Sequence, residues 1–424
     1  MNKGFGLVGC SLLILATLTA CGGGGGDGSS TAAPPVNGKG SGSSPVTPPS
    51  NRTASNNTMA GFLYVTHFFD LTMSAFTINA TTGALSEVAG NPVVVDKNAL
   101  PGPGYISVHP SGKFVYVVDG RGFTAEGPPQ SGIVAAYAVD ASTGALSEVA
   151  GSPFATGISP SCLKIDPSGK FAYVTHTISR DVSAYAINAY AINATTGALS
   201  EIAGSPFMAG NNPTASMAIH PSGKFAYLAH YGNPGTITGY AINATTGALT
   251  SIGVRAGAMS PGTIIVDPSG KFAYLTDGGS VPSPPGGILA YTINATTGLL
   301  SEVAGSPFAT ARSPNSIAVD PSGKFAYVTG YFNLDSVLAA FTINPTTGAL
   351  SEISPYSVNF YAHSVTVDDS GGFVYVINTT DDSNAGIYGF SINTTTGALS
   401  SPRQFATFDH GVDVKYITAN RRSQ

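Results

Sequence analysis

The stretch that decides the fold is Asp320-Pro321-Ser322-Gly323-Lys324-Phe325-Ala326-Tyr327-Val328, because full or degenerate copies of it return along the whole chain. Its tyrosine position is held by Tyr64, Tyr116, Tyr173, Tyr227, Tyr274, Tyr327 and Tyr375, at spacings of 52, 57, 54, 47, 53 and 48 residues. A second motif, Thr-Thr-Gly-Ala-Leu-Ser or a close variant, follows every copy, with its glycine at Gly83, Gly144, Gly197, Gly247, Gly298, Gly348 and Gly397. The sequence is therefore one unit repeated seven times.

Each unit contains four short hydrophobic runs, which we name strands A to D in chain order. In the sixth unit we expect them at residues 316–319, 324–329, 337–343 and 349–353. Pro321 presets the turn between A and B, and Gly323 is free to take a positive φ there. Repeats of about 40 to 50 residues with four strands each are typical of propeller blades. The sequence predicts an all-β fold, a single seven-bladed β-propeller with four-stranded blades.

The two ends of the repeat array predict how the ring closes. The first unit lacks strand A, whereas the last is followed by a surplus strand at Gly411–Ile417. We expect this C-terminal strand to complete blade 1, which leaves no open sheet edge at the seam. The propeller is predicted over residues 59–418, with a C-terminal tail at 419–424.

The third unit departs from the pattern, because Ala184–Asn188 is repeated at once as Ala189–Asn193. Five is an odd number, so a continuous strand would exchange its two faces after the insertion. We expect one copy to bulge or loop out instead.

The N-terminus reads as an export signal. An apolar stretch at residues 7–18 follows Lys3 and is too short for a membrane span, which predicts a lipoprotein signal peptide at residues 1–20. It ends in Leu18-Thr19-Ala20-Cys21, which resembles the bacterial lipoprotein cleavage box, so we expect a lipid anchor on Cys21. Ordinary secretory cleavage is the alternative. Residues 21–58, rich in Gly, Ser and Pro, predict a disordered tether. We expect an exported lipoprotein at the outer membrane or cell surface.

Composition excludes several classes of protein. Charged residues make up 10% of the chain against roughly 25% in ordinary soluble domains, which argues against a coiled coil or a disordered protein. The net charge of −5 provides no basic field for nucleic acid. Three cysteines cannot form a disulfide framework. Haem, phosphate-loop and zinc-protease motifs are missing from the sequence. We expect a monomer without a cofactor.

The repeats resemble a known family. Tyr-Val-Thr at residues 64–66, 173–175 and 327–329, with Asp-Pro-Ser-Gly and Thr-Thr-Gly-Ala-Leu, is similar to the lactonase-type seven-bladed propellers, which include 6-phosphogluconolactonases and fungal muconate lactonizing enzymes. The resemblance covers Met59–Thr418 and implies lactone chemistry by His, Arg and Glu at one channel mouth. The positions that would carry the Arg-His pair hold Gly104-Tyr105, Ser161-Cys162, Ala215-Ser216, Gly262-Thr263, Asn315-Ser316, His363-Ser364 and His410-Gly411. Because none of them is Arg-His, the activity does not transfer residue by residue.

Histidines gather on one predicted face. The face where B strands end and A strands begin, here called the upper face, carries His67, His176, His230, His363 and His410. Asp119, Asp277 and Asn378 occupy equivalent B-strand ends. We expect a polar ring that binds a ligand, with His67, His363 and His410 converging near the channel mouth. Whether it would bind a metal stays open. The alternative is that these residues are solvated or bond the loop backbone. His109 and His220 replace the aspartate of the A–B turn, which favours a structural role.

Cys162 raises a further hypothesis for catalysis. The hairpin register predicts it on the same face as His176, about 7 Å away, so a Cys-His nucleophile is one interpretation. A buried small hydrophobe is the other. The catalytic candidates are Cys162, His176, His363 and His410.

Two functions remain open. The favoured hypothesis is a lipid-anchored propeller of the cell envelope that uses its upper face to bind an envelope protein or a glycan. The alternative is a divergent lactonase-type hydrolase that acts on a lactone or sugar acid in the upper central pocket. We favour the binding module because the family's catalytic residues fail to map.

Overall fold

The computed structural model describes residues 59–67, 70–95, 103–120, 131–176, 185–210, 212, 214–232, 234–279, 285–310, 313–332, 335–358, 360–379, 385–407 and 414–421. The chain divides into two units, Met1–Asn57 and Thr58–Gln424. The predicted signal peptide, Cys21, the tether and His410 lie outside the described residues. In the described part of the chain no helix is long and apolar enough to cross a bilayer.

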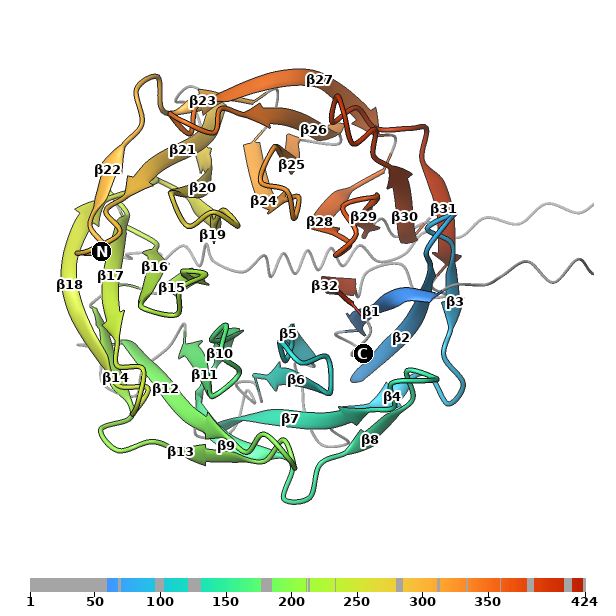
Figure 1. The fold of residues 1–424 in the computed structure, drawn as a ribbon, viewed down its shortest axis with the longest axis vertical. Helices are drawn as coiled ribbons and strands as arrows, with labels where there is room; N and C mark the ends of the chain where they lie inside the picture. Colours follow the sequence, from blue (N-terminus) through green and yellow to red (C-terminus); the bar gives the residue numbers. More distant parts are fainter. Residues whose placement is uncertain are drawn as a thin grey trace, which may run out of the picture. The chain divides into compact units, whose positions relative to one another are not determined.

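Seven antiparallel sheets stand around one axis, which confirms the seven-bladed propeller (Figure 1). Blade 1 contains β1 (Met59–His67), β2 (Thr72–Asn79), β3 (Leu85–Glu87), β4 (Val93–Val94) and β32 (Val414–Arg421). Blade 2 contains β5 (Pro103–Val108), β6 (Phe114–Asp119), β7 (Ser131–Val139), β8 (Leu146–Glu148) and β9 (Phe154–Ile158). Blade 3 contains β10 (Pro160–Ile165), β11 (Phe171–His176), β12 (Tyr185–Ile192), β13 (Leu199–Glu201) and β14 (Phe207–Gly210).

The remaining blades follow the same order from the axis outward. Blade 4 contains β15 (Thr214–Ile219), β16 (Phe225–His230), β17 (Thr236–Ile242) and β18 (Leu249–Ala256). Blade 5 contains β19 (Pro261–Val266), β20 (Phe272–Gly279), β21 (Pro285–Ile293), β22 (Leu300–Glu302) and β23 (Phe308–Ala309). Blade 6 contains β24 (Ser313–Val319), β25 (Phe325–Phe332), β26 (Asp335–Ile343) and β27 (Leu350–Val358). Blade 7 contains β28 (Ala362–Val367), β29 (Phe373–Asn378), β30 (Gly386–Ser391) and β31 (Arg403–Thr407).

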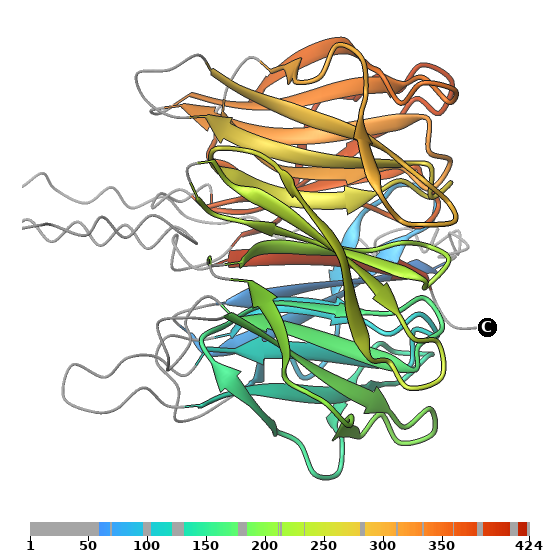
Figure 2. The same ribbon diagram turned by 90° about the vertical axis from the view of Figure 1, so that its left-hand side faces the viewer.

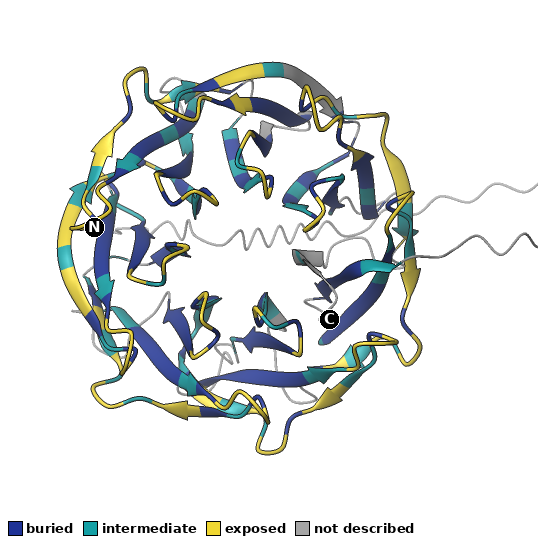
Figure 3. Cartoon of the chain, in the orientation of Figure 1, coloured by how far each residue is buried: buried dark blue, intermediate teal, exposed yellow. Residues whose placement is uncertain are grey.

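The core lies between the blades. Strands run from one face of the ring to the other (Figure 2), and both faces of each B and C strand are buried against neighbouring blades. Buried residues accordingly follow the inner and middle strands, whereas the outermost strands and the turns are exposed (Figure 3). This arrangement explains why large and small apolar residues alternate in Phe-Ala-Tyr-Val, because each blade has to fit two neighbours.

The C-terminal strand closes the ring, as predicted, by pairing antiparallel with β1. The register differs from the sequence prediction, since Tyr64 pairs with Thr418 and Gly61 with Arg421. This pairing gives Lys415 the place at the strand start that His410 was predicted to take. It also extends β32 into the predicted tail. Blade 1 has no A–B turn to limit the two strands, so they pair further than in the other blades.

The predicted bulge in blade 3 is wrong for the pairing of β12 with β11, whereas the register of β12 with β14 shifts between Tyr185 and Ala186. β12 pairs with β11 without a register shift, from Phe171 with Ala191 to Thr175 with Ile187. The second copy takes the C position, where Tyr190 packs towards blade 2, while Tyr185 of the first copy packs towards blade 4. The strand tolerates this exchange of faces because both faces of a blade are buried in apolar surroundings.

Neighbouring blades are joined by a hydrogen bond from the repeated B-strand tyrosine. Its hydroxyl donates to the carbonyl of the Thr-Thr-Gly glycine in the next blade. Six such bonds of 2.8 to 3.1 Å join Tyr116 to Gly197, Tyr173 to Gly247, Tyr227 to Gly298, Tyr274 to Gly348, Tyr327 to Gly397 and Tyr375 to Gly83. The two sequence motifs therefore meet in one contact, which we call the blade clasp.

The phenylalanine two residues before each tyrosine completes the blade clasp. Gly298 has a φ of 73°, and a Cβ there would lie 2.5 Å from the Phe225 ring. Glycine is required on both counts, because its backbone adopts positive φ without cost and the ring packs directly on it. Blade 1 departs from this pattern, since the Tyr64 hydroxyl is buried and has no hydrogen-bond partner in the described part of the chain.

The blade clasp predicts a contrast between two identical substitutions. Tyr227→Phe leaves the buried Gly298 carbonyl without its donor and should reduce the free energy of unfolding by about 1 to 2 kcal/mol. Tyr64→Phe removes a hydroxyl that makes no such bond and should be neutral or stabilising. Urea unfolding of the two variants measures both effects. Equal losses would show that the hydroxyl bond does not hold the blades together.

Candidate functional site

The B-strand ends of the upper face carry the residues predicted as a polar ring. Five of these residues are the last residues of their strands, and Asp277 lies two residues before the end of β20. In chain order they are His67 of β1, Asp119 of β6, His176 of β11, His230 of β16, Asp277 of β20 and Asn378 of β29. In the described residues this ring is buried, apart from Asp277, which is half-buried. A ligand approaching the upper face therefore meets little of these side chains.

His176 and His230 are held on both ring nitrogens. Nδ1 of His176 donates to the Ala186 carbonyl at 3.2 Å, and Nε2 lies 3.2 Å from the Thr156 hydroxyl. Nδ1 of His230 donates to the Asn212 carbonyl at 3.3 Å, and Nε2 lies 3.0 Å from the Thr238 hydroxyl. A carbonyl only accepts, so Nδ1 carries the proton and the hydroxyl donates to Nε2. Both imidazoles are neutral structural links to the loops around them.

Burial dominates the ionisation of three upper histidines. It lowers the pKa of His67, His176 and His230 to about 4 in each case. His67 also has its Nε2 2.9 Å from the Ser74 hydroxyl on the neighbouring strand. The sequence allowed two interpretations of the polar ring, binding of a ligand and bonding of the surrounding loops. The contacts of these histidines agree with the second.

The acidic and amide members of the ring fix the entry into strand A. The Asp277 carboxylate accepts hydrogen bonds from the backbone N–H groups of Met259, Ser260 and Gly279 at 2.9 to 3.1 Å. Asn378 accepts one from the N–H of Tyr361 at 3.0 Å. Oxygen acceptors at this position hold the segment that leads into strand A, or the start of the next loop.

His363 differs from the other described histidines of the upper face because it lies on an inner strand and stays half-buried. Its carbonyl accepts hydrogen bonds from Asn315 Nδ2 at 2.9 Å and from the Thr329 hydroxyl at 3.3 Å. The predicted convergence with His67 and His410 stays a prediction, since His410 is not described. Among the described residues, no three His, Cys, Asp or Glu side chains are placed to hold a metal ion.

The sequence analysis missed a set of hydroxyl groups at the upper end of the inner strands. The threonine two residues after the B-strand tyrosine donates from its hydroxyl to the start of strand A in the next blade, from Thr66 to Gly104 at 3.0 Å and from Thr276 to Asn315 at 3.0 Å. Ser161 adds a bond to Thr175 at 3.0 Å. The signal was the recurrence of threonine before the B-strand end, which was used only as a family signature.

The Cys-His hypothesis meets a contrary register. A register shift between Pro160 and Cys162 inserts Ser161, so Cys162 pairs with Thr175 and not with His176. Cys162 packs towards blade 4, whereas His176 contacts Thr156 of β9 on the other face. Burial is complete and raises the pKa of the Cys162 thiol. The predicted shared face is wrong, and Cys162 has the surroundings of a structural cysteine.

The two histidines of the lower turns lie where the repeats predicted. Nε2 of His109 donates to the Gly169 carbonyl and Nε2 of His220 to the Gly270 carbonyl, both at 2.8 Å. Each bond reaches the A–B turn of the next blade. These imidazoles therefore join blades at the face opposite to the candidate site.

The fold and the site define a seven-bladed propeller with polar residues around the inner strands at the upper face. Comparison with known proteins identifies the family of this propeller. The chain belongs to the family described as lactonase, 7-bladed beta-propeller, which matches residues 52–206, 134–308 and 303–416. These ranges run from blade 1 to the closing strand. A search among curated proteins finds no match.

Solved structures with the same fold share little sequence with this chain. A candidate 6-phosphogluconolactonase of Bacteroides uniformis has a TM-score of 0.66 and 18% identity, over 85% of this chain and 99% of its own. The periplasmic gluconolactonase of Pseudomonas aeruginosa has a TM-score of 0.64 and 15% identity, over 86% and 100%. A protein of unknown function from Desulfotomaculum acetoxidans has 0.64 and 14%, over 85% and 99%. At these identities the likeness establishes the fold.

The buried histidines predict a pH dependence of stability. Their pKa of about 4 lies below the ordinary value of 6.5, so the unfolded chain binds more protons between these values. The stabilisation is complete above pH 6.5 and is lost as the pH falls through 4, at roughly 3 kcal/mol for each imidazole. His176→Gln, which keeps a donor and an acceptor, should lose less stability than wild type between pH 7 and 4.5 in urea unfolding. An unchanged pH dependence would contradict the assignment.

Proposed function

We propose that the protein is a lactone hydrolase that acts at the upper end of the ring axis. Membership of the lactonase family across all seven blades carries the proposal. The periplasmic gluconolactonase of Pseudomonas aeruginosa, whose fold covers the same blades, supports the substrate class. The comparisons therefore favour the hydrolase over the display module expected from the sequence.

His363 is the residue we assign as general base. Unlike His67, His176 and His230, it stays half-buried on an inner strand at the upper rim. An imidazole there takes a proton from a water molecule that attacks the lactone carbonyl. The ring C–O bond then breaks, and the leaving alkoxide regains a proton to give the hydroxy acid. Half-buried Ser161, Thr263 and Asn315 offer polar groups for the lactone oxygens at the same level.

Lactone hydrolysis tests this assignment. In a pH-stat, the protein should release acid from glucono-1,5-lactone or 6-phosphogluconolactone faster than the spontaneous rate. His363→Gln should lower kcat by roughly 100-fold or more, the usual worth of a general base. His220→Gln is the matched control, because it lies in a lower turn and an amide can keep the bond to Gly270. If the His363→Gln variant turned over lactone as fast as wild type, His363 would not be the general base. If wild type hydrolysed neither lactone, the proposal of a lactone hydrolase would be wrong.

A lipid-anchored display module is the second candidate. One observation favours it, which is that the strand-A positions matching the family's Arg-His pair hold other residues, including Gly104, Ala215 and Gly262. Such a module binds an envelope protein or a glycan on the upper face and turns over no lactone. The same assay therefore separates the two candidates.

Attachment through Cys21 belongs to either candidate and rests on the lipoprotein-like sequence Leu18-Thr19-Ala20-Cys21. Two or more acyl chains give stable membrane attachment. Radioactive palmitate should label the full chain in a bacterial host, and Cys21→Ser should abolish labelling. Label retained by that variant, or none in wild type, would leave ordinary secretion as the explanation.

A further inference from the structure

One position of the inner strands varies between blades in an ordered way. It is identified by register, because each residue at this position pairs with the repeated B-strand tyrosine of its own blade. The seven residues, from blade 1 to blade 7, are Thr418, Ser107, Lys164, Ala218, Ile265, Ala318 and Thr366. We call this set the axial ring, since its strands are the innermost of each blade (Figure 1).

The axial ring keeps contact with solvent. All of its residues except Ala218 are half-buried, whereas the residue before each in the strand is buried wherever it is described, as Leu163 and Ile264 show. Adjacent inner strands contact one another around the axis. The exposed part of these side chains therefore belongs to the axial side of the ring.

Polar and apolar residues are separated within the axial ring. The polar members are contiguous on blades 7, 1, 2 and 3, as Thr366, Thr418, Ser107 and Lys164, whereas blades 4, 5 and 6 provide Ala218, Ile265 and Ala318. Positions that serve the blade, such as the clasp tyrosine, stay the same in all copies. A position that varies this way gives the axis one polar wall and one apolar wall.

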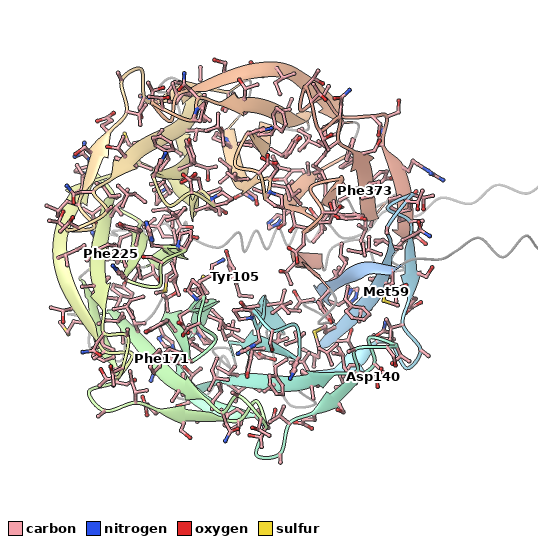
Figure 4. The ribbon with its side chains drawn as sticks, in the orientation of Figure 1. Met59, Tyr105, Asp140, Phe171, Phe225 and Phe373 are labelled. Carbon is pink, nitrogen blue, oxygen red and sulfur yellow. The ribbon has the colours of Figure 1, made fainter. Side chains whose placement is uncertain are left out.

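Lys164 provides the charge of the polar wall. Its Nζ lies 5.3 Å from the ring centroid of Tyr105, which comes from blade 2 and lies at the inner side of the ring (Figure 4). Within the described part of the chain, no carboxylate forms an ion pair with Lys164, and it is the one charged residue among the inner-strand side chains described. The cation is thus positioned by an aromatic ring and keeps its capacity for an anion.

The next position in each strand is aliphatic and packs against the cores between the blades. These side chains, half-buried in every described blade, are Val108, Ile165, Ile219, Val266, Val319 and Val367. They lie on the side of the lower turns, below the axial ring. Below the axial ring, the inner strands therefore continue into the apolar cores between the blades.

We propose that the axial ring binds a small organic monoanion, a carboxylate carried on an apolar body. The carboxylate pairs with Lys164 and accepts from the hydroxyls of Ser107, Thr366 and Thr418. The apolar body lies against Ile265 and Ala318, which keep contact with solvent. A single cation favours a single negative charge, and the apolar wall disfavours a polyhydroxylated sugar acid. The inference goes beyond lactone hydrolysis, because it needs no reaction and uses residues other than His363.

Binding of benzoate to the full chain, measured by calorimetry against its uncharged analogue benzamide, tests the proposal. Benzoate should bind saturably at one site, and benzamide at least tenfold more weakly, which is the loss expected for one charge-assisted pair. Lys164→Met should weaken benzoate by the same factor, whereas Lys164→Arg should keep it. Lys170→Met, in the exposed A–B turn of the same blade, is the matched control and should bind like wild type.

A second variant keeps the test independent of the folding of Lys164→Met. Ala318→Glu places a carboxylate on the apolar wall and should weaken benzoate much more than benzamide. No benzoate binding at millimolar concentration, or equal binding by wild type and Lys164→Met, would overturn the proposal. If the protein bound benzoate but hydrolysed no lactone, the anion-binding proposal would stand and the lactone-hydrolase proposal would be wrong. The two proposals can therefore be refuted separately.

Discussion

The contact between a tyrosine, a phenylalanine and the glycine of the next blade is the constraint on which this ring depends. It joins the two motifs that recur along the chain, so each unit contributes to the contact on both of its sides, apart from the Tyr64 hydrogen bond between blades 1 and 2, which is missing among the described residues. A buried hydroxyl and a ring packed on bare backbone leave no room for another side chain. This explains why turn and strand sequences are repeated together although they lie in different blades of the ring.

The same repetition limits where function can reside. The upper ends of the B strands use their imidazoles and carboxylates to fix loops, as His176 and Asp277 show. Some positions of the inner strands do not fix a loop. Lys164 and His363 lie at such positions, and the matching positions of the other blades hold other residues. Chemistry that varies from copy to copy is therefore concentrated along the axis, within a frame that the blade clasp keeps constant.

Much of the fold follows from the spacing of Tyr64 to Tyr375 and of the turn glycines, because blade number and strand order need only the period. The site followed less well. The irregular register at Ser161, which turns Cys162 away from His176, leaves no trace in the sequence. The closing strand was misplaced by several residues because no turn fixes its register with β1. Burial of the histidines depends on loops that neighbouring blades supply, which a single repeat does not reveal.

The continuous strand β12 has a consequence for how such a chain changes over time. Ile187 and Ala189 are buried on one face and Tyr190 on the other, and the strand accommodates both after a five-residue duplication. In a sheet with one wet face, an odd insertion would turn apolar side chains into water. In a blade, both faces are buried, so an odd insertion leaves the apolar side chains buried on either face. Replication slippage within a middle strand can therefore change the length of a repeat without disrupting the ring.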